Sequence, residues 1–144
     1  MSWVRIWVHL VFSTKNREKL LLKDFRNNIY DHIKHNADEK KICLDTINGY
    51  LEHIHCLVSL NKEYSISKVT QLIKGESSRW INNNDFLRNK FSWQDDYWAV
   101  SVSDSHLEAV RNYIQNQEEH HRNKSFAEEI EVFMKKYGWQ YIKS

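Results

Sequence analysis

Two histidines stand two positions apart inside an apolar run, "GYLEHIHCLVSL" at residues 49–60. The run is typical of a strand, and side chains at i and i+2 of a strand share a face, so His53 and His55 point to the same side. Their Cα atoms would lie roughly 6–7 Å apart, near enough for both imidazoles to reach one cation. The spacing leaves two interpretations open: half of a metal site, or two polar residues on a half-exposed face.

A second pair of chemically capable residues lies in "HLEAVRNYIQNQEEHH" at 106–121, which has helical periodicity. Its apolar stripe consists of Leu107, Val110 and Ile114. Tyr113 and Gln117 are i and i+4, so they lie one above the other at the edge of that stripe. A phenol and an amide oxygen therefore face the same place and could complete a metal shell, although a Tyr beside an apolar stripe is usually core packing and a Gln is usually solvated.

The remaining histidines and the cysteines predict less. His120 and His121 either bind metal or interact with the helix C-terminus through its dipole, and we favour the structural role. We expect ordinary structural positions for His9, His32, His35 and His106, although His9 lies on the first predicted strand. Cys43 and Cys56 lack metal-type spacing and are interpreted as reduced core thiols.

The elements that must position these residues follow from periodicity. The predicted strands are 3–12, 42–47, 53–60 and 97–103, and the predicted helices are 24–36, 65–81, 106–121 and 126–137. The order β-α-β-β-α-β followed by two helices predicts an α+β fold of the ferredoxin-like split βαβ type. Its antiparallel sheet would carry helices on one face, over Ile54 and Cys56, and leave the other face free for a site or a second subunit.

Capping signals predict where the helices begin and end. Asp24 is the expected N-cap of the first helix. Two capping boxes, Ser105 with Glu108 and Ser125 with Glu128, would open the last two helices, and Gly138 would close the final one. Asn48 and Gly49 are a turn signal between the second and third strands.

Length and composition limit the class of protein. The chain has 144 residues, 41% hydrophobic and 28% charged, with a net charge of +2. We therefore expect one domain over residues 1–144, with no membrane span and no secretory signal, in the cytoplasm. The charge balance neither requires nor excludes nucleic acid as a partner.

Taken together, "HIHCLV", "KGESSRW" and "YIQNQ" resemble the single-tyrosine HUH transposases, small single-strand DNA transposases of insertion sequences with palindrome-associated relatives. The resemblance extends from the opening "HLVFSTKNR" to the late "HHRNKSFAEEIEVFMKKYG". It implies an enzyme in which His53, His55 and Gln117 bind the metal and Tyr113 is the nucleophile. Glu52 departs from the aspartate that many relatives carry before the first histidine, but the acid is retained.

The resemblance also implies the reaction and the partners. A divalent metal, Mg²⁺ or Mn²⁺, would help Tyr113 cleave single-stranded DNA at hairpin-marked element ends, giving a 5′-phosphotyrosine and a free 3′-OH that a reverse attack rejoins. The family works as homodimers, in which the tyrosine helix of one subunit can complete the site of the other.

Basic side chains that would pair with DNA phosphates are Lys15, Arg17, Lys74 and Arg79. Two other functions stay open from the sequence. One is a domesticated or inactive relative that binds palindromic single-stranded DNA without transposing it. The other is a structural domain stabilised by zinc on His53, His55 and His120, which chelation would unfold.

Overall fold

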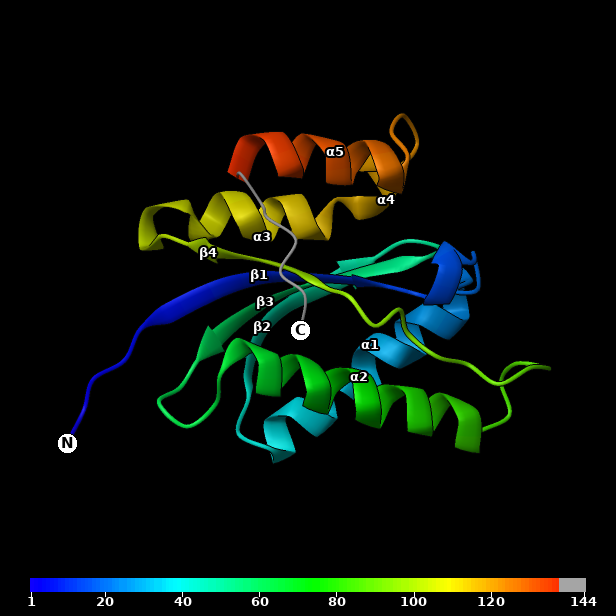
Figure 1. The fold of residues 1–144 in the computed structure, drawn as a ribbon, viewed down its shortest axis with the longest axis horizontal. Coiled ribbons are helices and arrows are strands. Elements are labelled where there is room, and N and C mark those ends of the chain that lie inside the picture. Colours follow the sequence, from blue (N-terminus) through cyan, green and yellow to red (C-terminus); the bar gives the residue numbers. More distant parts are fainter. Residues whose placement is uncertain (138–144) are drawn as a thin grey trace.

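The computed structural model describes residues 1–137, and its centre is a four-stranded antiparallel sheet (Figure 1). The strands are β1 (Ile6–Ser13), β2 (Cys43–Gly49), β3 (His53–Leu60) and β4 (Trp98–Val102), in the order β2-β3-β1-β4. β1 pairs with β3 and β4, and its residues from Val8 onward are buried, as its nearly continuous apolar character predicted. The ferredoxin-like split βαβ fold expected from the sequence is confirmed.

Two helices cover the first face of the sheet, α1 (Lys23–Glu39) and α2 (Ile66–Asn83). Ser65 caps α2 by accepting a hydrogen bond from the backbone N–H of Lys68 at 3.0 Å. Beneath these helices lies the main core, where Ile54 and Cys56 of β3 are fully buried. This is the face on which the sequence placed them.

The second face is also covered, which differs from the expectation that it would be free. The segments above it are η2 (Asp104–His106), α3 (Leu107–Gln115), α4 (Gln117–His120) and α5 (Phe126–Tyr137) (Figure 1). Leu107 and Ile114 of α3 pack on Leu57 of β3, while Phe126 and Phe133 of α5 pack with Val11 of β1 in a separate cluster. The histidine-bearing face of β3 therefore lies under helices.

Several local predictions were wrong, each because of a tertiary partner or a shifted boundary. α1 begins at Lys23 with Leu22 as its N-cap, so Asp24 lies in the first turn instead. The Ser105–Glu108 box does not form, since Glu108 bonds Arg111, whose guanidinium also binds Asp45 at 2.8 Å. Asn48 and Gly49 both belong to β2 rather than to the turn.

The predicted boundaries of the last helices and the predicted burial of the cysteines were confirmed only in part. The helix expected over 106–121 is interrupted at Asn116, which separates α3 from α4. The Ser125–Glu128 box at the start of α5 is confirmed, with the Glu128 N–H donating to Ser125 Oγ at 3.2 Å. The predicted stop at Gly138 lies outside the described residues. Both cysteines are free, but Cys43 is exposed, so only Cys56 is the expected core thiol.

A short helix, η1 (Lys15–Arg17), follows β1. None of the helices within residues 1–137 is both long enough and apolar enough to cross a bilayer.

Candidate metal and nucleophile site

The pairing of β1 with β3 gathers three imidazoles on one face of the sheet. Val11 lies opposite His55 in the register and Ser13 opposite His53, while His9 lies two positions before Val11 on the same face of β1. His53 and His55 are fully buried, and His9 is only 3% exposed. Strand alternation thus supplies the shared face that the sequence predicted for the histidine pair.

The Nδ1 atom of each paired histidine has its own side-chain partner, Glu52 or His9. His53 Nδ1 lies 2.8 Å from Glu52 Oε1, and because a carboxylate only accepts, this Nδ1 carries the hydrogen. His55 Nδ1 lies 2.8 Å from His9 Nε2. The Nε2 atoms of His53 and His55 both face the centre of the cluster. An imidazole whose other nitrogen donates to a carboxylate is the usual arrangement of metal-ligating histidine.

Gln117 joins the histidines because the helix breaks just before it. Its side chain is fully buried, and its Oε1 lies 3.1 Å from His53 Nε2. Its amide nitrogen donates to the carbonyl oxygen of Tyr113 at 3.3 Å, which turns the amide oxygen toward the imidazoles. His53 Nδ1 already carries a hydrogen, so in a neutral His53 the Nε2 atom has only a lone pair. That lone pair faces a lone pair of Gln117 Oε1, and the two repel each other. This contact is favourable only with a proton or a metal ion between the two atoms, so the donor set fits a cation.

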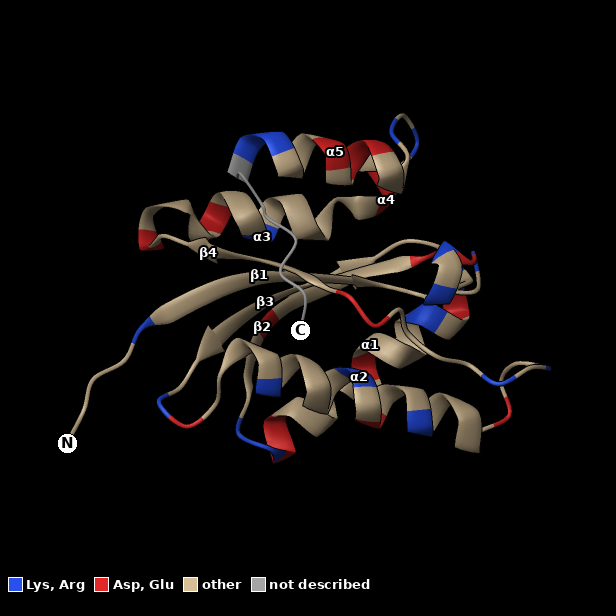
Figure 2. Cartoon of the chain, viewed as in Figure 1, with Lys and Arg blue, Asp and Glu red and all other residues tan. Residues whose placement is uncertain are grey.

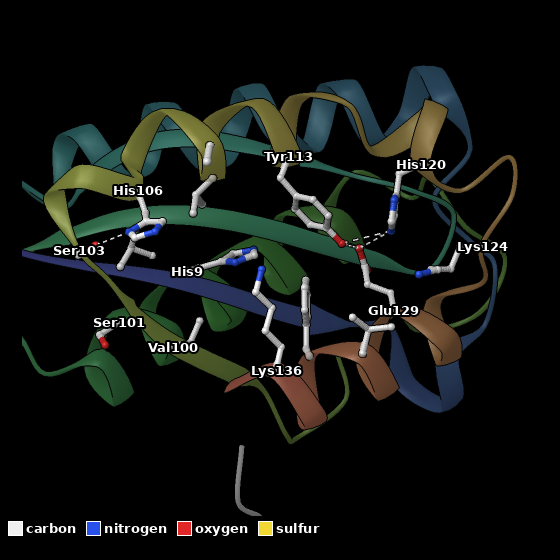
Figure 3. A pocket seen from close by; sticks show the side chains of 15 residues that line it. His9, Val100, Ser101, Ser103, His106, Tyr113, His120, Lys124, Glu129 and Lys136 are labelled. Atoms are coloured by element: carbon white, nitrogen blue, oxygen red, sulfur yellow. Dashed lines mark hydrogen bonds and ion pairs between the residues drawn. The ribbon is translucent and has the colours of Figure 1, made fainter. Parts of the chain in front are cut away.

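The Tyr113 hydroxyl lies beside the same cluster, in the same chain (Figure 3). It donates a hydrogen bond to Glu129 Oε2 and lies 3.2 Å from His120 Nε2. The Tyr113 ring packs edge-on against the imidazole of His55 with a centroid separation of 5.8 Å. Tyr113 also lines a cavity of about 650 Å³ bounded by residues of β4, α3 and α5.

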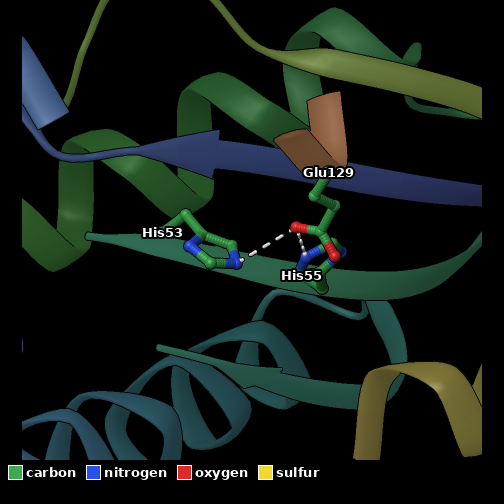
Figure 4. A group of neighbouring side chains, drawn as sticks. All are labelled: His53, His55 and Glu129. Atoms are coloured by element: carbon green, nitrogen blue, oxygen red, sulfur yellow. Dashed lines mark hydrogen bonds and ion pairs between the residues drawn. The ribbon is translucent and has the colours of Figure 1, made fainter. Parts of the chain in front are cut away.

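Glu129 of α5 is the residue that the sequence analysis missed. Its carboxylate is 1% exposed, with Oε1 3.3 Å from His53 Nε2 and 3.1 Å from His55 Nε2 (Figure 4). One donor atom from each of these three residues lies within 4.8 Å of the others, so the group could hold a metal ion. A signal existed: Phe126 and Phe133 mark the buried face of α5, and Glu129 falls on that face at i+3 and i−4.

His120, His121 and His9 also belong to the cluster, although we expected structural or ordinary roles for them. His121 Nδ1 donates to the Lys124 carbonyl at 2.6 Å, and its Nε2 lies 3.1 Å from Gln117 Oε1. His120 and His121 form, with Glu129, a second group whose donor atoms lie close enough to hold an ion. The end of α4 and the residue after it thus bring both rings to the site, with His121 buried and His120 partly exposed.

The electrostatics of the cluster favour positive charge next to the carboxylates. Burial lowers the pKa of His53, but hydrogen bonds to Glu129 and Glu52 outweigh burial and raise that pKa above its usual value. Burial lowers the pKa of His55 to about 4. For Glu129, burial acts to raise the pKa, yet hydrogen bonds with His121, His53 and His55 hold it well below its usual range. Glu129 is therefore ionised among the imidazoles.

Of the four basic residues selected from the sequence, two lie near the histidine cluster and two lie across the sheet from it. Lys15 and Arg17 form η1, at the end of the sheet where His53 begins β3, and the Arg17 guanidinium lies 5.1 Å from the ring centroid of Phe126. Lys74 and Arg79 lie on α2, across the sheet from the histidines, and Lys74 Nζ donates to the Gln94 carbonyl at 2.5 Å. Figure 2 shows further Lys and Arg in the loop between α4 and α5, at the same end as η1.

Comparison with known proteins gives a consistent result. A family model described as "Transposase IS200 like" matches residues 2–117. The ISDra2 transposase TnpA of Deinococcus radiodurans is 22% identical over 114 residues, covering 76% of this chain and 81% of the relative.

Two solved structures share the fold. One, a candidate transposase from Deinococcus radiodurans R1, superposes with a TM-score of 0.66 and 21% identity over 81% of this chain and 93% of its own. The other is a REP-associated tyrosine transposase bound to a REP hairpin. It superposes with a TM-score of 0.63 and 16% identity, over 84% of this chain and 72% of its own.

Proposed function

The chain belongs to the IS200-like transposase family, the single-tyrosine HUH transposases, and from that membership we propose that it cleaves and rejoins single-stranded DNA with Tyr113 as the nucleophile. One observation carries the proposal: the phenol hydroxyl, two imidazoles and an amide oxygen meet in one chain beside a cavity. We further propose that residues 1–144 act as one domain.

The residues that would hold the metal are His53, His55 and Gln117, whose donor atoms converge as described above. When bound, Mg²⁺ or Mn²⁺ would polarise the scissile phosphate and stabilise the 3′ leaving oxygen. Glu52 and His9 keep the two imidazoles turned so that each Nε2 faces inward. Two imidazoles also accept Zn²⁺, so the metal is to be identified by assay.

Tyr113 would attack in line with the leaving oxygen. Its phenol oxygen forms a bond to phosphorus as the bond between phosphorus and the 3′ oxygen breaks, which leaves a 5′-phosphotyrosine and a 3′-OH. The phenol proton passes to solvent, and solvent supplies the proton of the new hydroxyl. Attack by a 3′-OH on the phosphotyrosine reverses the step and rejoins DNA, with the number of phosphodiester bonds conserved.

DNA is the proposed partner, and hairpin-marked single strands are the proposed substrate class. Support comes from the related structure that holds a REP hairpin and from Lys15 and Arg17 near the site. Lys74 and Arg79 lie across the sheet, so they would contact DNA only outside the cleavage site. Replacing Arg17 with Ala should weaken hairpin binding and reduce its dependence on salt, while Arg79→Ala should leave cleavage chemistry unchanged.

The subunit arrangement is testable because the proposed site is complete within one chain. We propose a homodimer, as the family resemblance implies, in which Tyr113 acts on the histidines of its own chain. Mixing Tyr113→Phe with His55→Ala subunits should then restore no activity. Activity of the mixed dimers would instead require the tyrosine of one subunit to serve the histidines of the other.

The deciding experiment incubates the protein with a hairpin-bearing single-stranded oligonucleotide and Mn²⁺ and looks for a covalent adduct on a denaturing gel. The wild type and the control Tyr97→Phe should form the adduct, whereas Tyr113→Phe should bind DNA without forming it. His55→Ala should lose metal-dependent cleavage but keep its fold.

An adduct formed by Tyr113→Phe would remove Tyr113 as the nucleophile. Tight hairpin binding by the wild type without cleavage in any divalent metal would instead support a binding-only relative. Loss of the fold on chelation would support a structural zinc site.

A further inference from the structure

The C-terminal helix α5 lies beyond the part of the chain that the family model matches, residues 2–117. It packs Phe126, Ile130 and Phe133 against Val11 of the central strand, next to Trp98 and Tyr113. The Phe126 ring also stacks on the imidazole of His53, with centroids 4.1 Å apart and planes within 10°. This packing places α5 directly over the proposed metal ligands.

Glu129 is the polar residue that α5 contributes to this interface. Its Oε1 lies 3.3 Å from His53 Nε2 and 3.1 Å from His55 Nε2, and Gln117 Oε1 lies 3.1 Å from His53 Nε2. Neighbouring donors around one ion bound at about 2.1 Å are about 3.0 Å apart in octahedral and about 3.4 Å apart in tetrahedral geometry. The measured separations fall in this interval, so Glu129 Oε1 is spaced from the imidazoles as one more ligand would be.

The charge of Glu129 supports the same role. The side-chain partners that the structure gives it are four imidazoles and the Tyr113 phenol, and the carboxylate is 1% exposed. A buried carboxylate requires compensating positive charge close to it. A divalent ion among these donors would supply that charge.

We propose that Glu129 is a fourth protein ligand of the metal, so that the bound ion fastens α5 onto the sheet above Tyr113. The proposal rests on the metal site of the proposed function and adds to it a ligand outside the family-matched region. Because Glu129 Oε2 also accepts the Tyr113 hydroxyl hydrogen, the same carboxylate positions the phenol beside the ion. Metal loading and the docking of α5 then stabilise each other.

Metal affinity provides the first test. Mn²⁺ is titrated calorimetrically into the DNA-free wild type, Glu129→Gln and the control Glu131→Gln, which changes an exposed carboxylate on the same helix. Glu129→Gln keeps the side-chain shape and should bind Mn²⁺ at least about tenfold more weakly than the wild type. Loss of an outer-sphere partner alone can weaken binding by that factor, so loss of a direct ligand should weaken it at least as much. Glu131→Gln should bind like the wild type. Equal affinity of Glu129→Gln and the wild type would overturn the proposal.

Hydrogen exchange provides the second test and does not depend on affinity. In the wild type, saturating Mn²⁺ should make the amides of α5 exchange more slowly than they do without the metal. In Glu129→Gln this protection should be lost, although the ion is bound. Protection that is equal in the two proteins would overturn the proposal even if the affinities differ.

A His55→Ala control distinguishes failure of the proposed metal site from failure of the Glu129 ligand alone. If His55→Ala loses Mn²⁺ binding while Glu129→Gln keeps both affinity and α5 protection, the metal site of the proposed function stands and the Glu129 ligand does not. If the wild type itself binds no Mn²⁺, both are overturned together.

Discussion

Gly49, at the end of β2, supports a sharp prediction because a side chain there has no space. A Cβ at Gly49 would lie well under 3.0 Å from the carbonyl oxygen of His53 and at 3.0 Å from Ile54 Cα and Tyr30 Oη. The His53 carbonyl cannot yield easily, since it accepts the Tyr50 N–H at 3.0 Å to close the turn into β3. Gly49→Ala must therefore displace the start of β3, and with it His53, by about 1 Å.

The expected cost follows from overpacking of backbone against backbone. Such changes destabilise by about 1–3 kcal/mol, and for a chain of this length each kcal/mol corresponds to roughly 3–4 °C in Tm. Gly49→Ala should thus lower Tm by roughly 3–12 °C. It should also weaken Mn²⁺ binding, since a shift of His53 moves one of the proposed donors.

Gly75 in α2 is the matched control. A Cβ added there meets nothing within 4 Å, and alanine is a better helix former than glycine. The same substitution should therefore stabilise by about 0.5–1 kcal/mol and leave Mn²⁺ binding unchanged. Thermal unfolding with a chelator present measures the Tm of both variants. If Gly49→Ala unfolds at the wild-type midpoint, or if the two glycines respond alike, the steric reasoning is refuted.

Three further substitutions test a buried hydrogen bond of the core, the N-terminal cap of α5 and the buried imidazole of His9. Ser77→Ala removes the acceptor of the buried Trp93 indole N–H, a bond of 2.9 Å, and should cost about 1–3 kcal/mol in urea unfolding; a change below the measurement error would mean that the indole finds another partner. Ser125→Ala removes the cap that accepts from the Glu128 N–H and should cost about 1 kcal/mol, seen as faster amide exchange in α5; unaltered exchange would contradict it. Burial lowers the pKa of His9 from 6.5 to about 3, so the unfolded chain binds this proton first and stability should fall as pH drops from about 6.5 toward 3. In chelator, His9→Phe should flatten that part of the profile of unfolding midpoint against pH, whereas parallel profiles would refute the assignment.

The fold was predictable because its elements carry local signals. The strand "HIHCLVSL" has the predicted bounds, 53–60, since alternation and a polar turn define both ends. The break at Asn116 was not predictable, because the apolar stripe ends at Ile114 and Gln117 is held by an imidazole of a strand distant in sequence. The Ser105–Glu108 box failed for a similar reason, since Glu108 binds Arg111, and Arg111 is anchored on β2.

The site was predictable only in part. His53, His55, Tyr113 and Gln117 stood out through spacing and family resemblance, and the structure brings their side chains together, although their roles stay predictions. Glu129 did not stand out, because a glutamate in the first turn of a helix usually interacts with the dipole and with solvent. Its burial depends on α5 packing onto the second face of the sheet, and local periodicity does not encode which surface an amphipathic helix will cover.

The central position of β1 has a consequence for the order in which the fold assembles during synthesis. During synthesis β1 emerges before both of its neighbours: β3 follows, with Ile6 opposite Leu60, and β4 ends at Val102. The side chains of the buried cluster include those at positions 53, 55, 117 and 129, so late translation products alone contain all four. Strand pairings between residues so far apart in sequence slow folding, because the intervening chain must first be brought together. A nascent chain interrupted before α5 emerges therefore holds His53, His55 and Gln117 but lacks the Glu129 carboxylate of the buried cluster.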